Sequence, residues 1–252
     1  MQNSLLIGLS RQVALQRELD VVANNIANMN TSGYKADGAV FEEFLSPVAR
    51  AADTRNRISF VHDRATWHDL SQGAVERTGN PLDVALQGDG FLVVQTPRGE
   101  RYTRNGALQL NAAGELVTAS GMRVMGDGGV IRFQPTDRDI VIAQDGTISV
   151  KEGTQTQTSS LRGKLRVVAF ARPQQLQKAG DGTFSADAGN APRPDPQTRL
   201  LQGAVEKSNV RGVVEITRMI EVTRSYTQVA SMIQQQAEMR QSALQKLADV
   251  PN

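Results

Sequence analysis

The C-terminal end of the sequence contains the feature that most constrains the fold, a helical pattern too long for a compact globule. From Met219 to Ile233, apolar residues are spaced 3, 4, 3 and 4 apart, which is the spacing of a coiled coil. Residues 206–248 contain no proline and a single glycine, Gly212. A helix of about 40 residues would be roughly 55–60 Å long, so it needs a second helix along its length.

The N-terminal end supplies a second amphipathic helix over residues 3–29. Its apolar stripe contains Leu15, Leu19, Val22 and Ile26, which share one face of a helix. The run from Asn30 to Gly33 is a helix stop signal. Two amphipathic ends without a partner between them most simply pair with each other, or with copies of themselves.

The middle of the chain has the character of a β domain. Short β-type runs such as Phe91–Val94, Ile140–Ile142 and Leu165–Phe170 are separated by glycine-rich turns such as Gln87–Gly90, a pattern typical of strands and hairpins. The predicted fold class is therefore α+β. Long N- and C-terminal helices form a coiled-coil-like helical domain, and a mostly antiparallel β domain is inserted between them.

These patterns divide the chain into three regions. Residues 1–34 and 206–252 form a discontinuous terminal helical assembly domain, and residues 85–205 form the β-rich domain. Residues 35–84 are expected to be an extended connector, irregular over residues 46–80, because they show neither sustained periodicity nor regular turn signals.

Composition excludes several classes of protein. The 252 residues include 28 basic and 26 acidic side chains and no cysteine. Without long basic runs we expect no nucleic-acid partner, and without cysteine there are no disulfides, thiolate metal sites or cysteine nucleophiles. No segment approaches the roughly 18 apolar residues of a membrane span. The first residues lack a basic n-region, so we expect no cleavable secretory signal.

The connector contains the one candidate metal or acid–base cluster, His62-Asp63 and His68-Asp69. Its spacing fits no helical ligand pair, and no third ligand accompanies it. Polar connector residues are the favoured interpretation, with Trp67 as a packing anchor. No nucleophile motif occurs either, so we expect no enzymatic activity, no metal and no cofactor.

Three asparagines, Asn24, Asn25 and Asn28, lie near the end of the N-terminal helix. Asparagine there commonly serves only to end a helix. Helical geometry, however, places Asn24 and Asn28 opposite the apolar face, with Asn25 at its flank. Because an amide both donates and accepts hydrogen bonds, we hypothesise that these side chains bond between helices and fix their register.

Four motifs in order along the chain resemble the bacterial flagellar rod and hook family. Residues 23–35, ANNIANMNTSGYK, are similar to the family's N-terminal signature, and residues 202–210 are similar to its C-terminal signature. Residues 78–91 resemble the start of its β domain, and Tyr102–Gly106, followed by GELVT, resembles its hairpins. The resemblance runs from end to end.

The resemblance implies a structural subunit of the axial rod that crosses the periplasm and transmits torque. The proximal rod type is favoured, with the distal rod type as the alternative. The implied partners are other rod proteins, copies of this chain and the flagellar type III export apparatus, which would export the chain without a cleavable signal peptide. The terminal helices would form an inner tube, with the β domain outside.

The expected assembly interface draws on both ends of the chain. Its residues are Leu15, Leu19, Val22, Asn24, Asn25, Ile26, Asn28, Asn30, Gly33, Tyr34, Ser208, Asn209, Val210, Met219, Ile220, Val222, Tyr226, Val229 and Ile233. Asn30 and Gly33 are expected to form the exit turn of the first helix, and Asn209 to cap the first turn of the last.

Two other functions remain open from the residues alone. A monomeric binding module would close its two helices on each other as a stalk, without polymerising. A peptidoglycan-cleaving enzyme would suit a protein that crosses the periplasm, but the sequence offers it no paired acids or metal ligands.

Overall fold

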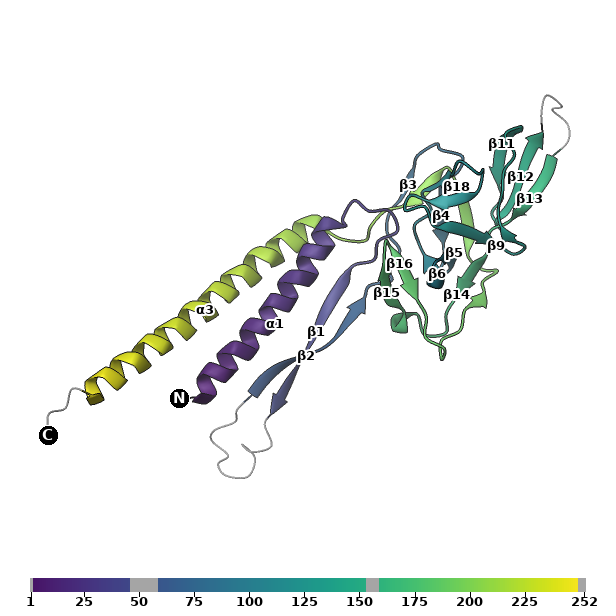
Figure 1. Ribbon diagram of the computed structural model, residues 1–252. Coiled ribbons are helices and arrows are strands. Elements are labelled where there is room, and N and C mark those ends of the chain that lie inside the picture. Colours follow the sequence, from purple (N-terminus) through teal and green to yellow (C-terminus); the bar gives the residue numbers. More distant parts are fainter. Residues whose placement is uncertain (1, 46–58, 153–158, 249–252) are drawn as a thin grey trace. The chain divides into compact units, whose positions relative to one another are not determined.

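The computed structural model describes residues 2–45, 59–152 and 159–248, and the chain divides into two compact units (Figure 1). We call them the helical unit and the β unit. The helical unit comprises Met1–Ala27, Asp37–His68 and Arg211–Asn252. The β unit comprises Asn28–Ala36 and Asp69–Val210. Each unit is therefore built from segments that are distant in the sequence.

Two long helices, α1 (Gln2–Ala27) and α3 (Gly212–Ala248), lie side by side and antiparallel in the helical unit (Figure 1). They share a small core of Leu15, Val222 and Val229, with Leu19, Tyr226 and Ile233 packed against it. Polar contacts border this core: Arg218 binds Glu18 at 2.8 Å, and Gln12 donates to the Tyr226 hydroxyl at 3.0 Å. The predicted pairing of the two ends occurs within one chain. No helix in the described residues is long and apolar enough to cross a bilayer.

A β-hairpin completes the helical unit, where the sequence predicted an extended connector. Strand β1 (Asp37–Leu45) pairs antiparallel with β2 (Ser59–His68). The prediction of irregular structure is thus wrong for residues 59–68. Charged and histidine residues interrupt the apolar residues of β2 and hide the strand pattern. Near the base of the hairpin, Trp67 lies against Gly38 so closely that a Cβ at position 38 would be 2.2 Å from its indole nitrogen. Trp67 is 48% exposed, so only part of its side chain packs.

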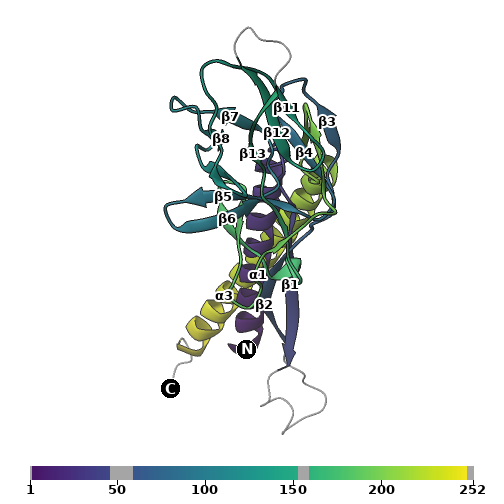
Figure 2. The ribbon, with the colours of Figure 1, turned by 90° about the vertical axis from the view of Figure 1, so that its right-hand side faces the viewer.

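All paired strands of the β unit are antiparallel, which confirms the predicted arrangement (Figure 2). The largest sheet has the order β15-β16-β6-β5-β9-β8-β7, with β10, β14 and β17 attached. Beside it lie a three-stranded sheet, β11-β12-β13, and the pairs β18-β4 and β19-β3. The strands are β3 (Val75–Arg77), β4 (Val84–Gln87), β5 (Phe91–Thr96), β6 (Gly99–Thr103), β7 (Leu108–Leu110), β8 (Leu116–Thr118), β9 (Arg123–Gly126), β10 (Gly129–Val130), β11 (Asp137–Ile142), β12 (Thr147–Glu152), β13 (Ser159–Lys164), β14 (Val167–Ala169), β15 (Gln177–Gly180), β16 (Thr183–Ser185), β17 (Arg193–Pro194), β18 (Arg199–Gln202) and β19 (Ala204–Glu206), with a 3-10 turn η1 at Pro173–Gln175.

Strand β5 explains the uninterrupted apolar run at residues 91–94. Successive side chains of a strand point to opposite faces. Leu92 and Val94 enter a large aliphatic core, while Phe91 and Val93 enter a second core that is rich in aromatic rings. Because both faces of β5 are covered, the strand needs no polar alternation.

Ion pairs to Glu115 stabilise the hairpin in which it lies. The Glu115 carboxylate accepts hydrogen bonds from Arg132 at 2.7 Å, Arg123 at 3.0 Å and Asn111 at 3.1 Å. The Arg132 bond, with help from Asn111, lowers the pKa of Glu115 below its ordinary value of 4.5. A carboxylate with a lowered pKa stabilises the folded state above pH 4.5, and this stabilisation is lost as the pH falls through the folded-state pKa.

We therefore predict that Glu115→Gln lowers the urea midpoint of the β unit at pH 7, and that the difference from the parent chain shrinks as the pH falls below 4.5. Urea unfolding of both chains between pH 3 and pH 7 measures this difference in midpoint. Glu100→Gln, at a more exposed carboxylate, is the control. A difference between Glu115→Gln and the parent that persists unchanged at pH 3 would contradict the assignment.

Candidate functional site

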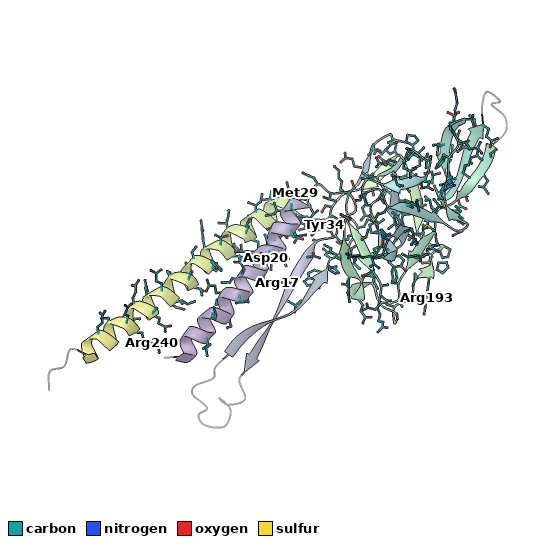
Figure 3. The ribbon with its side chains drawn as sticks, in the orientation of Figure 1. Arg17, Asp20, Met29, Tyr34, Arg193 and Arg240 are labelled. Carbon is teal, nitrogen blue, oxygen red and sulfur yellow. The ribbon has the colours of Figure 1, made fainter. Side chains whose placement is uncertain are left out.

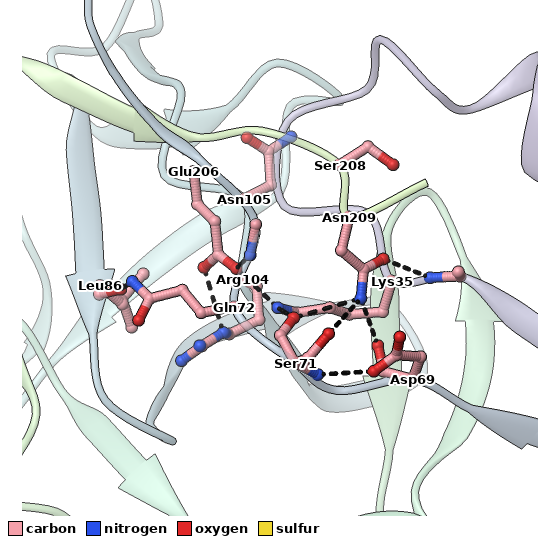
Figure 4. A network of polar contacts seen from close by, with 12 residues as sticks. Lys35, Asp69, Ser71, Gln72, Leu86, Arg104, Asn105, Glu206, Ser208 and Asn209 are labelled. Atoms are coloured by element: carbon pink, nitrogen blue, oxygen red, sulfur yellow. Dashed lines mark hydrogen bonds and ion pairs between the residues drawn. The ribbon is translucent and has the colours of Figure 1, made fainter. Parts of the chain in front are cut away.

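The β unit binds together the four segments through which the chain continues into the helical unit. The chain passes between the units after residues 27, 36, 68 and 210. Inside the β unit, the residues next to these points meet in one polar network (Figure 4). We call this set the junction network; its central members are Lys35, Ser71, Arg104, Glu206 and Asn209.

Glu206 is the only carboxylate at the centre of the junction network. Its Oε1 atom lies 2.6 Å from the Lys35 amine and accepts the Gly73 N–H at 3.0 Å. The Lys35 amine also donates to the Ser71 carbonyl at 2.7 Å. The Lys35 and Glu206 side chains are 1% and 0% exposed. This ion pair is therefore removed from water and joins residues 171 positions apart in the sequence.

Arg104 places a second cation beside the same carboxylate. Its Nε atom lies 3.3 Å from Glu206 Oε2, an ion pair without the alignment of a hydrogen bond. Its Nη1 atom donates to the carbonyls of Gly88 and Gly90, and its guanidinium lies 5.5 Å from the centre of the Phe91 ring.

Burial opposes both cations, and Glu206 offsets that effect. Burial lowers the pKa of Lys35, while the hydrogen bond and the charge of Glu206 act to raise it. The pKa of Arg104 is likewise lowered by burial and supported by Glu206. One carboxylate thus compensates two buried cations, and its loss would leave both without their nearest counter-charge.

Asn209 ties three segments together, which corrects its predicted role as a helix cap. Helix α3 begins only at Gly212, so Asn209 does not occupy the capping position of its first turn. Instead, the Asn209 side-chain oxygen accepts the Ala36 N–H at 2.8 Å, and its amide donates to the Asp69 carbonyl at 2.8 Å. Its own N–H donates to the Tyr34 carbonyl at 3.4 Å. The sequence showed an amide near a helix start, but not the distant backbone groups of Ala36 and Asp69 that hydrogen-bond to it.

The turn after α1 reaches the same network. Gly33 has φ +68, and a Cβ there would lie 2.4 Å from the Asn105 nitrogen. Its N–H donates to the Glu206 carbonyl at 2.7 Å. The predicted exit turn from Asn30 to Gly33 is confirmed, and Gly33 is needed for both its backbone conformation and the close approach.

Tyr34 and Lys35 are covered by the edge hairpin of the main sheet. The Lys178 amine lies 3.9 Å from the centre of the Tyr34 ring and donates to the Lys35 carbonyl at 2.7 Å. Tyr34 and Lys35 therefore have separate partners. The Lys178 amine lies over the Tyr34 ring, and the buried Glu206 carboxylate pairs with the Lys35 amine.

Asn25 bonds between helices within the chain, as the hypothesis expects, while its role in setting the register between subunits stays a prediction. It is 1% exposed. Its amide donates to the Asp37 carbonyl at 2.8 Å and to Glu215 at 3.4 Å, and its oxygen accepts the Asp37 N–H at 2.9 Å. Asn25 thus braces α1 against β1 and α3. By contrast, Asn24 is exposed, and the Asn28 side-chain oxygen accepts a hydrogen bond from the Thr31 hydroxyl in the exit turn.

The apolar residues expected at the interface fall into three groups, of which the half-buried one consists of Leu19, Ile26, Val210, Tyr226 and Ile233. Leu15, Val22, Val222 and Val229 are buried within the chain. Met219 and Ile220 are exposed by 37% and 49%. Large apolar side chains that lie together on a surface commonly mark an interaction site.

The histidine-containing connector provides no metal site in the described part of the chain. No group of three or more histidine, aspartate or glutamate residues there is arranged to hold an ion. His68 binds the Asp37 carboxylate at 2.5 Å and closes the base of the β1–β2 hairpin. The side chains of His62 and Asp63 lie outside the described residues.

Comparison with known proteins matches three sequence families along the chain. Residues 5–35 match the family described as flagella basal body rod protein, and residues 201–246 match the flagellar basal body rod FlgEFG protein C-terminal family. Residues 85–150 match the flagellar hook protein FlgE/F/G D1 domain.

Curated relatives match over the whole length. The chain is 38% identical to flagellar basal-body rod protein FlgF of Caulobacter vibrioides, over 99% of this chain and 100% of the relative. This chain belongs to the flagellar basal-body rod protein family. It is also 37% identical to FlgF of Salmonella typhimurium over 82% of each chain. It is 33% identical to flagellar basal-body rod protein FlgG of Buchnera aphidicola from Schizaphis graminum, over 98% of this chain and 99% of the relative.

The junction network coincides with the family motifs quoted from the sequence. Lys35 ends the N-terminal motif, Arg104 lies in the central hairpin motif, and Glu206 and Asn209 lie in the C-terminal motif. The sequence did not predict that these four residues contact one another, because no local pattern links them. The signal available was that the three motifs, far apart along the chain, each contain a charged residue beside a turn.

We predict that Glu206→Gln destabilises the β unit by about 3–5 kcal/mol, because it removes the nearest counter-charge of two buried cations. Lys35→Met should cost less, because Arg104 and Glu206 then remain as a balanced pair. Hydrogen exchange of the β5 amides measures the free energy of opening. Glu76→Gln, which breaks an exposed pair with Lys207, is the control and should cost under about 1 kcal/mol. Equal losses for Glu206→Gln and Glu76→Gln would contradict the analysis.

Proposed function

We propose that this chain is a structural subunit of the bacterial flagellar basal-body rod, of the proximal type represented by its FlgF relatives. The observation that carries the proposal is the full-length similarity to FlgF of Caulobacter vibrioides. The chain acts by assembly rather than by catalysis. Its partners are neighbouring rod proteins and copies of itself, and it transmits torque across the periplasm after unfolded passage through the type III export apparatus.

In this proposal the two units divide the work. The terminal regions 1–34 and 206–252 form the assembly domain, in which helices pack in coiled-coil fashion against those of neighbouring subunits. The exposed apolar side chains on α1 and α3 support this role. Residues 85–205 form the outer β domain, and the junction network holds together the segments that continue into the helical unit. Pairing of α1 with α3 inside one chain is equally compatible with a monomeric stalk, but full-length similarity to rod proteins favours the subunit.

A distal rod subunit is the second candidate, because FlgG relatives also match over 98% of this chain. Complementation separates the two. We predict that the chain restores swimming to a Caulobacter strain that lacks FlgF, and leaves a strain that lacks FlgG non-motile. Each strain's own protein, expressed from the same promoter, is the control. Rescue of only the strain without FlgG would overturn the proximal assignment, and rescue of neither would count against a rod function.

A further inference from the structure

The first strands of the β unit take their strand partners from its last strands. Among the described residues, β3 pairs with β19 and with no other strand, and β4 pairs only with β18. Both ladders are antiparallel, and one short segment of chain supplies the second strand of each. We call residues 199–209 the latch; it contains β18, β19 and Asn209.

The rest of the β unit forms its strand pairs without the latch. The main sheet contains only strands that lie between β5 and β17 in the chain, and β11, β12 and β13 pair with one another. Several of these pairs are hairpins of consecutive strands, such as β5–β6, β7–β8 and β15–β16. The strand before the latch, β17, joins the main sheet through β14 (Arg193 is labelled in Figure 3). The strand pairing of the main sheet is therefore complete before the latch begins.

The latch closes the aliphatic core of the β unit. Leu200 is 2% exposed and packs in the same core as Val84 and Leu86 of β4. Gly203, between β18 and β19, has φ +74, and its N–H donates to the Asp83 carbonyl at 2.8 Å. Without the latch, β4 would lose both its strand partner and part of its apolar cover.

Charge makes the burial of the N-terminal segment depend on the latch. Glu206 is the nearest counter-charge of the two buried cations of the junction network, and cations buried without one are costly. The N–H groups of Gly33 and Ala36 donate to the Glu206 carbonyl and to the Asn209 side chain. The N-terminal segment therefore lacks its counter-charge and two of its hydrogen-bond acceptors until the latch arrives.

The contacts of the latch join residues that are far apart along the chain. Gly73 and Glu206 are 133 positions apart, and Lys35 and Glu206 are 171 positions apart. Pairing over such distances costs loop-closure entropy before any contact compensates it, so it forms slowly. Hairpins of consecutive strands do not have this cost. Pairing of the latch is therefore expected to follow pairing of the main sheet.

We infer that the latch closes last, and that its docking completes the β unit and forms the junction network in the same step. The latch itself rests on the topology of the β unit. Its consequence for assembly rests on the proposed function, in which the chain passes the export apparatus unfolded. An extended chain cannot close the latch while residues 33–36 and 199–209 lie on opposite sides of a channel. The β unit is thus completed only after both segments have passed.

Pulsed hydrogen exchange during refolding of the full-length chain from urea tests this order. The amides of Gly33, Ala36 and Gly73 report the latch directly, because each donates to a latch residue. We expect these three amides to become protected at least about tenfold more slowly than the amides of β5 and β6. Unfolding for about one second before refolding keeps the prolyl bonds in their native isomers, since their isomerisation takes about 10–100 s. Protection of both groups in one phase, or of the three reporter amides first, would overturn the inference.

Two matched core substitutions show which step needs the latch. Leu200→Ala alters the latch, and Leu116→Ala in β8 is the control; both leucines lie in the aliphatic core and are 2% and 0% exposed. We expect Leu200→Ala to change the rate of β5 protection by less than about twofold while it slows or abolishes protection of the reporter amides, and Leu116→Ala to slow β5 protection.

Loss or slowing of β5 protection in Leu200→Ala, to the extent seen in Leu116→Ala, would place the latch in the first step and refute the inference. Both measurements use the isolated chain. Complementation tests the rod function separately, so the failure of one proposal is distinguishable from the failure of the other.

Discussion

The organisation of this chain depends on one buried carboxylate. Glu206 holds Lys35 from the N-terminal segment and Arg104 from the β domain, and its own segment leads into α3. Two cations out of water are tolerated because a carboxylate lies beside them and carbonyls accept further hydrogen bonds from them. Around this centre, Asn209 and Gly33 complete the backbone pairing of segments that are otherwise far apart. The β unit thereby holds together the four segments that continue into the helical unit.

The helical unit is built differently. The cluster shared by α1 and α3 has three buried side chains and three partly buried ones, although α1 has 26 residues and α3 has 37. Ordering each backbone residue costs roughly 1–2 kcal/mol, and isolated helices are marginal in water. At the same time, apolar residues remain exposed on both outward faces. This combination suits a subunit whose helices gain most of their stability from neighbours.

The sequence predicted the regular elements well and the tertiary polar contacts poorly. Periodicity located α1 and α3, the uninterrupted run at Phe91–Val94 indicated a strand, and Gly33 marked the exit turn. The β1–β2 hairpin was missed because charged residues break its alternation. Lys35 and Glu206 could not be paired from sequence, since 171 positions separate them.

The asparagines illustrate the same limit. An amide can cap a helix, brace a strand or bond to a neighbour, and the sequence shows only that an amide is present. Asn25 and Asn209 are each used by backbone groups of the same chain. Which use applies is decided by the tertiary partner. Local spacing favoured a cap for Asn209, and it favoured a bond between helices for Asn25 without showing the bonds to Asp37.

The central claim is that the β unit is stable alone while the terminal helices await neighbouring subunits. Hydrogen exchange of the purified chain in dilute solution tests it most directly, by comparing the amides of α1 and α3 with those of β5 and β6. The account predicts helix amides that exchange orders of magnitude faster than the β5 amides, and that become protected when the chain assembles. Helix amides as protected as β5 in the dilute monomer would contradict it, and would favour a self-contained helical stalk.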